Sequence, residues 1–129
     1  MVVDSSAIVA ILLGEDGGPD LLRHLDSAGR LFMSSFSWFE ASVVIESRKG
    51  AEGSRLLNQF FSMFAFEFIP FDTGQAEIAM DAWRRYGKGR HKAGLNLGDC
   101  ASYALARTLN RPLLFKGDDF PFTDVARME

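Results

Sequence analysis

Residues 95–106 read LNLGDCASYALA, in which a glycine and an acid precede a run of small and apolar residues. The spacing of Ala101, Ala104 and Leu105 is typical of the buried face of a helix, which places Asp99 in the first turn. An acid there can stabilise the helix start, because its carboxylate accepts hydrogen bonds from unpaired amide groups. It can also be a metal ligand that faces a cleft. Both roles stay open until the rest of the chain is considered.

Short apolar segments alternate with helical ones along the chain. The predicted strands cover residues 1–3, 30–34, 66–70 and 113–115, and helices are expected between them, with Gly50 ending the third helix. Alternation of this kind predicts a three-layer α/β/α Rossmann-like fold. We expect a central parallel sheet of four to five strands, within a single domain over residues 1–129.

Helical spacing also predicts which residues face inward. A helix around 54–64 is apolar over more than one face, so we expect Phe60 and Phe61 to contribute to a dimer surface. For the helix over 37–49, the residues expected to face inward are Trp38, Ala41, Ser42 and Ile45. For the helix over 73–86, one face is expected to carry Ala76, Ala79, Met80 and Trp83.

The composition excludes several classes of protein. Hydrophobic residues make up 47% of the chain and charged residues 24%, which argues for a folded domain and against disorder. No apolar run approaches the roughly 20 residues that a membrane span needs. The N-terminus lacks a basic region and carries Asp4, so it predicts a strand and a helix rather than a signal peptide. Cys100 is the only cysteine, which excludes an internal disulfide and fits the reducing cytoplasm.

The charge distribution favours one basic segment. A net charge of -3 argues weakly against nonspecific binding of nucleic acid. Residues 84–92, however, read RRYGKGRHK and form a local basic patch. This patch is either an RNA contact or a solvated loop with no ligand.

Acidic residues follow the predicted strands. Asp4 comes directly after the first strand, Glu40 lies in the first turn after the second, and Asp118 and Asp119 follow the last. Asp99 opens the helix before that last strand. In open parallel sheets, ligands bind beyond the carboxyl ends of the strands, so four separate segments bring acids to one edge.

Each acid alone also has a simpler interpretation. Asp4 can cap the first helix, Ser37 and Glu40 match a capping box, and Asp118-Asp119 can form a turn. One metal site would explain them together, because clustered carboxylates repel one another and a hard cation such as Mg²⁺ or Mn²⁺ removes that repulsion.

Four motifs resemble those of a known family. The sequence carries V-x-D-S-S-A at residues 2–7, Glu40, GDC-x-S-Y-A-L-A at 98–106 and LLFKGDDF-x-x-TD at 113–124. Together they resemble the PIN domain, and more narrowly the VapC-type toxins of bacterial toxin–antitoxin pairs. The resemblance implies that Asp4, Glu40 and Asp99 bind the metal. The fourth acid is Asp118 or Asp119, with Asp124 a weaker candidate.

The resemblance further implies a function. We expect a Mg²⁺- or Mn²⁺-dependent endoribonuclease that hydrolyses phosphodiester bonds of tRNA, rRNA or mRNA, inhibits translation and is neutralised by a cognate antitoxin. A homodimer is also expected, and the antitoxin or dimer groove is predicted between the first helix and residues 56–64. Ser6 would hold the substrate phosphate or a water, and the contacts to the RNA backbone would be Lys88, Arg90 and Lys92.

Two other functions compete with this one. A phosphoacceptor receiver domain also gathers acids around Mg²⁺ and carries a lysine after its last strand, as Lys116 does here. It would need paired acids after the first strand, whereas Asp4 stands alone. A non-catalytic binding module with the PIN shape is the second competitor, but it would have no reason to keep mutually repelling carboxylates.

Overall fold

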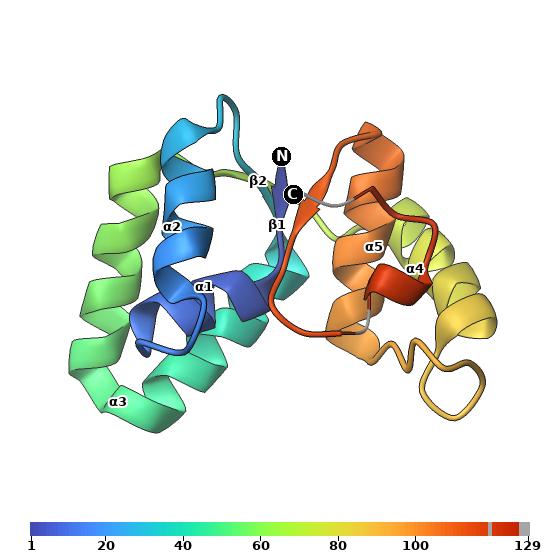
Figure 1. The fold of residues 1–129 in the computed structure, drawn as a ribbon, viewed down its shortest axis with the longest axis horizontal. Coiled ribbons are helices and arrows are strands. Elements are labelled where there is room, and N and C mark those ends of the chain that lie inside the picture. Colours follow the sequence, from blue (N-terminus) through green and yellow to red (C-terminus); the bar gives the residue numbers. More distant parts are fainter. Residues whose placement is uncertain (119, 127–129) are drawn as a thin grey trace.

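The computed structural model describes residues 1–118 and 120–126, and they fold around a parallel sheet (Figure 1). Their elements, in chain order, are β1 (Val2–Val3), α1 (Ser5–Leu12), α2 (Gly18–Ser27), β2 (Phe32–Ser34), α3 (Ser35–Phe64), β3 (Glu67–Ile69), α4 (Thr73–Tyr86), α5 (Leu97–Leu109), β4 (Leu113–Leu114) and the 3-10 turn η1 (Phe120–Phe122). No helix in this described part is both long and apolar enough to cross a membrane.

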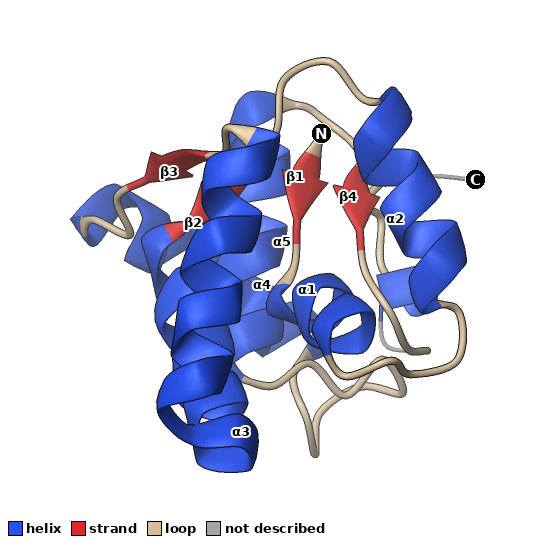
Figure 2. Cartoon of the chain, turned by 90° about the vertical axis from the view of Figure 1, so that its left-hand side faces the viewer, coloured by secondary structure: helices blue, strands red, loops and turns tan. Residues whose placement is uncertain are grey.

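The sheet has the order β3-β2-β1-β4, and all its pairings are parallel. Helices α1, α2 and α3 cover one face, and α4 and α5 cover the other (Figures 1 and 2). This confirms the predicted three-layer fold, with four strands among the described residues. The carboxyl ends of the strands share the lower edge in Figure 1, where α1, α3 and α5 begin.

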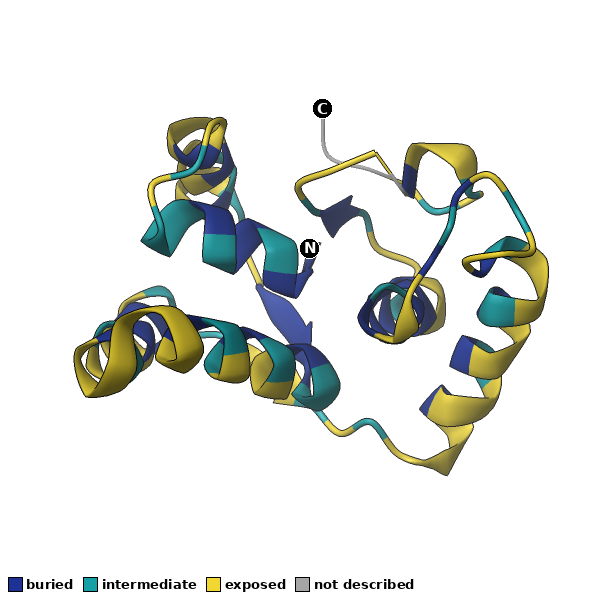
Figure 3. Ribbon diagram, turned by 90° about the horizontal axis from the view of Figure 1, so that it is seen from below, coloured by how far each residue is buried: buried dark blue, intermediate teal, exposed yellow. Residues whose placement is uncertain are grey.

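Successive residues of each strand pack on opposite faces of the sheet, as the pleat requires. In β1, β2 and β4 the first residue packs with α4 and α5, as seen for Val2, Phe32 and Leu113. The next residue packs with α1, α2 and α3, as seen for Val3, Met33 and Leu114. Viewed from the carboxyl edge, the helices bury the faces turned to the sheet and expose their outer faces (Figure 3). Strands this short can therefore organise two cores.

Helix α3 is two helical arms joined at Gly50. Its backbone is helical from Ser35 to Phe64 except at Gly50, which has φ 62° and ψ −152°. This positive φ favours glycine, because a side chain would be strained there. The prediction that Gly50 ends a helix is confirmed, although the second arm follows it directly.

The predicted surface on the second arm is wrong. Phe60 and Phe61 are 7% and 8% exposed and belong to the core beside α1. The ring of Phe61 packs edge-on against Phe66 and Phe68. Phe68 lies in β3 and Phe66 directly precedes it. Aromatic neighbours thus cover the additional apolar face that suggested a dimer surface.

Exposed apolar residues lie on the first arm instead. Its buried stripe is Ser37, Ala41 and Ile45, whereas Trp38 is 41% exposed and Phe39 59%. The inward position predicted for Trp38 is therefore wrong. The four α4 residues predicted on one face do share a face, which lines a cavity and leaves Met80 44% exposed. In α4 the buried stripe is Gln75, Ala79 and Ala82, which leaves Ala76, Met80 and Trp83 to line a cavity.

Candidate active site

Asp4 is held at the carboxyl end of β1 by hydrogen bonds to both carboxylate oxygens. Its Oδ2 accepts from the amide of Ser6 at 3.0 Å, which makes Asp4 the N-cap of α1. Its Oδ1 accepts from the hydroxyl of Ser102 on α5 at 2.5 Å. The Ser102 hydroxyl in turn lies 3.0 Å from that of Ser37 on α3. Asp4 therefore caps a helix and is also linked to two other helices.

The environment of Asp4 disfavours its charge. The side chain is buried, and this burial raises its pKa above the ordinary value of 3.8 despite the opposing hydrogen bonds from Ser102 and Ser6. Throughout the described residues, no lysine or arginine forms an ion pair with Asp4. A buried carboxylate supported only by hydroxyl and amide donors would gain from a nearby cation.

Glu40 extends from α3 toward Asp4 and the start of α5. Its Oε1 accepts from the Ser5 hydroxyl at 2.6 Å. Its carboxylate lies directly against Gly98, since a Cβ added to Gly98 would come within 2.3 Å of Oε1. Burial raises the pKa of Glu40, the Ser5 hydrogen bond opposes this, and the charge of Asp4 adds to the increase. The first two predicted acids therefore interact.

The start of α3 rules out the capping-box interpretation of Glu40. Helix α3 begins at Ser35, and its N-cap is Ser34, whose hydroxyl accepts from the amide of Phe36 at 3.2 Å. Ser37 lies inside the helix and contacts Ser102. The glutamate is thus available to the site because an earlier serine has taken the capping role.

Asp99 has the helix-start role that its position suggested. Its Oδ2 accepts from the amide of Asn96 at 3.0 Å, and the Asn96 side chain accepts from the Asp99 amide at 2.8 Å. These two bonds form a capping box at the start of α5. The neighbouring Cys100 has a pKa raised to about 11 by burial and by the charge of Asp99, so its thiol stays protonated at neutral pH.

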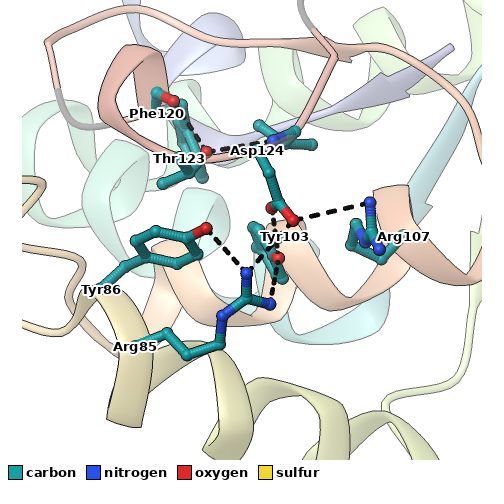
Figure 4. A network of polar contacts seen from close by, with 8 residues as sticks. Arg85, Tyr86, Tyr103, Arg107, Phe120, Thr123 and Asp124 are labelled. Carbon is teal, nitrogen blue, oxygen red and sulfur yellow. Dashed lines mark hydrogen bonds and ion pairs between the residues drawn. The ribbon is translucent and has the colours of Figure 1, made fainter.

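The candidates for the fourth acid differ in their surroundings. Asp118 follows β4 and is exposed at the same edge of the sheet, while Asp119 lies outside the described residues. Asp124 belongs to a separate network and accepts from the Tyr103 hydroxyl at 2.5 Å (Figure 4). It also pairs with Arg85 and Arg107. These contacts give Asp124 a structural role between α4, α5 and the C-terminal segment.

The predicted acids are only partly brought together. Within residues 1–118 and 120–126, no three His, Cys, Asp or Glu side chains are close enough to hold one metal ion. Asp4 and Glu40 interact electrostatically, but the Asp99 carboxylate is bonded to its own helix start and Asp118 is exposed. The shared metal site remains a prediction.

Two cavities meet at Glu40. One of about 400 Å³ extends toward Ser5, Ser6, Glu15 and Lys116. The other, of about 500 Å³, is largely apolar and is lined by α3 and the start of α5, including Phe36, Phe39, Val43 and Leu97. Glu40 therefore lines both cavities.

The chain between α4 and α5, residues 87–96, forms a loop that carries part of the basic patch and is called the basic loop below. It precedes the helix that carries Asp99. Its three predicted RNA contacts, Lys88, Arg90 and Lys92, are exposed. The Arg90 guanidinium lies over the Trp83 ring at 4.8 Å, and the Lys92 ammonium lies over the Phe122 ring at 4.9 Å. These cation–π contacts place both charged groups against aromatic rings, and the loop remains positively charged.

Sequence reasoning missed three hydroxyl groups. Ser5, Ser37 and Ser102 bind or support the two central carboxylates. Ser102 lies three residues after Asp99 on one helix face, and that spacing was the available signal. Ser6, which was predicted to hold a phosphate or a water, accepts from the backbone amide of Lys116 at 3.0 Å.

Comparison with known proteins gives the family. The PIN domain family matches residues 1–127 of the chain. A "Ribonuclease VapC" from Mycolicibacterium smegmatis is 48% identical over 126 residues, which cover 98% of this chain and 98% of that protein. The chain therefore belongs to the PIN domain family and, within it, to the VapC ribonuclease toxins of toxin–antitoxin systems. This membership excludes the phosphoacceptor receiver alternative.

Solved structures share the fold. VapC20 of Mycobacterium tuberculosis, described as a sarcin–ricin loop cleaving toxin, matches with a TM-score of 0.81 at 16% identity and covers 98% of this chain and 97% of that chain. A toxin–antitoxin complex from Klebsiella pneumoniae gives 0.70 at 17% identity, over 95% of this chain and 92% of that chain. At these identities the likeness concerns the fold alone.

Proposed function

We propose that this ribonuclease depends on Mg²⁺ or Mn²⁺ held by Asp4, Glu40, Asp99 and one of Asp118 and Asp119. The observation that carries the proposal is the Asp4–Glu40 pair. Both carboxylates have raised pKa values, and the charge of Asp4 contributes to the shift of Glu40. Their hydrogen-bond donors are hydroxyl and amide groups rather than cations.

These residues fit a hard divalent cation. Carboxylate oxygens are the ligands that Mg²⁺ and Mn²⁺ prefer, and a cation would offset the repulsion and desolvation that the pair now bears. When bound, the ion supplies Lewis-acid chemistry, which activates water and stabilises charge on the phosphate. The cavity that extends from Glu40 toward Ser6 and Lys116 gives the substrate access to this point.

The protein residues orient the reaction. Ser102 and Ser6 fix the two oxygens of Asp4, and Ser5 fixes one oxygen of Glu40. Fixed oxygens reduce the reorganisation that the site needs when the phosphate arrives. The basic loop with Lys88, Arg90 and Lys92 attracts the RNA backbone.

Cleavage assays test the metal dependence. Purified protein is incubated with total RNA and Mg²⁺ or Mn²⁺, with EDTA and Asp99→Asn as controls. We expect cleavage only with metal and intact Asp99, and calorimetric titration with Mn²⁺ should show weaker binding by Asp4→Asn. Cleavage that persists in EDTA or in Asp99→Asn would contradict the proposal. No cleavage under any condition would favour the non-catalytic module.

The basic loop is tested by salt dependence. Replacing Lys88, Arg90 and Lys92 by glutamine should weaken RNA binding and lower the salt slope by about 0.7 for each phosphate of a single strand that is no longer neutralised. Replacing Arg48, Lys49 and Arg55 on α3 by glutamine also removes three positive charges and is the control. Equal effects of the two sets would indicate that the loop is merely solvated.

We also propose a cognate VapB-type antitoxin and a homodimer as partners. The antitoxin is supported by the Klebsiella pneumoniae toxin–antitoxin complex, which has the same fold. We assign the dimer surface to the exposed apolar residues Trp38, Phe39, Val43, Met80 and Leu97.

The dimer assignment is tested by molecular mass in solution. Phe39→Glu should convert a dimer to a monomer, whereas Met63→Glu on the second arm of α3, where the residue is 69% exposed against 59% for Phe39, should not. An unchanged mass for Phe39→Glu would place the interface elsewhere.

A further inference from the structure

Lys116 is positioned at the edge of the sheet beside the candidate active site. Its backbone amide donates to the Ser6 hydroxyl at 3.0 Å, which joins the exit of β4 to the first turn of α1. Its Nζ pairs with Glu15 Oε1 at 3.0 Å. Both side chains line the same cavity of about 400 Å³ as Glu40. The lysine thus faces the substrate side of the acids.

Among the described residues that line this cavity, two are acidic and one is cationic. Glu15 and Glu40 are the acidic residues, and Lys116 supplies the positive charge. RNA brings further negative charge, so its approach to acids alone would be opposed. A cation at this place reduces the electrostatic repulsion between the RNA and the neighbouring carboxylates.

The Lys116–Glu15 pair is weak enough to exchange. Its side chains are 36% and 35% exposed, and solvent screening makes such surface pairs contribute little to stability. A phosphate oxygen accepts from an ammonium group as a carboxylate does. Glu15 therefore competes with RNA for the same partner.

We propose that Lys116 binds a non-bridging phosphate oxygen of the RNA, and that Glu15 holds the lysine in the free protein. The proposal rests on the proposed function, because it assumes RNA beside Glu40. Lys116 contacts substrate, and Glu15 acts through Lys116 as a positioning residue.

An opposite-sign experiment separates this role from a structural ion pair. Binding of a short fluorescein-labelled single-stranded RNA of mixed sequence is measured by anisotropy in the cleavage-silent Asp99→Asn background with Mg²⁺. Lys116→Gln should weaken binding about 5- to 10-fold at low salt and lower the salt slope by about 0.7. Glu15→Gln should strengthen it about 2- to 5-fold, and Lys116→Arg should retain it.

The Arg30–Glu67 pair is the matched control. Its atoms are 2.7 Å apart, it is also exposed, and it lies at the opposite, amino edge of the sheet. Arg30→Gln and Glu67→Gln make the same changes in net charge. If they shift binding as much as the site variants do, the effect is one of overall charge and the proposal is overturned.

Other outcomes are equally decisive. Unchanged binding in Lys116→Gln, or weakening in both Lys116→Gln and Glu15→Gln, would overturn the proposal in favour of a structural pair. Should Lys116→Gln fail to fold, the gain in Glu15→Gln still decides the question. RNA cleavage by the wild-type protein is scored separately, so a metal-dependent nuclease in which Lys116 does not bind RNA is distinguishable from a protein with no nuclease activity.

Discussion

Two carboxylate clusters in this molecule are built in opposite ways. Asp4 and Glu40 lie at the carboxyl edge of the sheet, and their hydrogen bonds come from Ser5, Ser6 and Ser102. Asp124 lies against α4 and α5, where Tyr103, Arg85 and Arg107 supply its partners (Figure 4). The first cluster receives neutral donors and the second receives two cations.

The pKa values follow this difference. Burial raises the pKa of Asp4 and Glu40, because neutral donors offset the loss of water only in part. Burial acts in the same direction on Asp124, but the Tyr103 hydrogen bond and the charges of Arg107 and Arg85 outweigh it and lower the pKa. A carboxylate that already has cationic partners is structural, whereas one without them is suited to bind a metal.

Asp4→Asn should have the largest effect. Loss of partners behind a metal ligand typically reduces activity or affinity 10- to 100-fold, so loss of a ligand should reduce cleavage by at least about 100-fold. The same change should raise Tm in EDTA, because asparagine keeps an acceptor for Ser6 and removes a buried charge. Cleavage kinetics and thermal unfolding check both effects.

The pH dependence gives a further check on Asp4. Its pKa is raised in the folded protein, so the stability it contributes is present below the ordinary value of 3.8 and is lost as the pH rises through the folded value. The stability of Asp4→Asn relative to the wild type should therefore increase as the pH rises from acid to neutral. Asp72→Asn, which alters an exposed N-cap of α4, is the control and should show no such gain. A fall in Tm for Asp4→Asn at neutral pH would show that burial of the Asp4 charge does not destabilise the fold.

Gly98→Ala should displace Glu40 without removing any acid. A methyl group there would approach Oε1 and Oε2 to 2.3 and 2.4 Å, so the carboxylate has to move. We expect cleavage to fall about 10- to 100-fold, as for other changes behind a metal ligand. Gly74→Ala is the control, since its nearest neighbour would be Asp72 Oδ1 at 3.5 Å. Wild-type cleavage by Gly98→Ala would show that the position of Glu40 is unimportant.

The residues at the carboxyl edge of the sheet could be predicted from sequence, because their positions follow from where each strand ends and in which direction it runs. Alternating apolar segments placed Asp4 after β1 and Asp118 after β4, and the structure retains both positions. The alternative interpretation of Ser37 and Glu40 as a capping box is wrong, because Ser34 caps the helix earlier. Sequence spacing does not distinguish between two serines that can each cap.

Side-chain networks could not be predicted in the same way. Ser102 lies within an alanine-rich helix and was given no role from sequence, although its hydroxyl supports Asp4. Phe60 and Phe61 were assigned to a surface because helical periodicity does not show which neighbours cover a face. Phe66 and Phe68 cover it, through contacts between α3 and β3.

Ser102→Ala should have a smaller effect than loss of an acid. It removes the 2.5 Å bond that orients Asp4 and leaves the Ser37 hydroxyl without that partner. We expect about a 10-fold loss of cleavage. Because this bond lowers the pKa of Asp4, its loss should move the acidic limb of the pH–rate profile to higher pH. Ser42→Ala, whose hydroxyl bonds to the Trp38 carbonyl at the surface, should leave the profile unchanged.

Asp124→Asn tests the other side of the comparison and should affect stability alone. Asparagine still accepts from Tyr103 but loses the charge that pairs with Arg85 and Arg107, and these are exposed pairs. The free energy of unfolding should fall by about 1 kcal/mol or less. Since the pKa of Asp124 is lowered, its contribution is present above the ordinary value of 3.8 and is lost as the pH falls through the folded value. Denaturant unfolding should thus show Asp124→Asn less stable than the wild type at neutral pH and close to it in acid, whereas Asp4→Asn should be more stable than the wild type at neutral pH. A loss of cleavage beyond the loss of folded protein would place Asp124 in the active site and remove the distinction between the clusters.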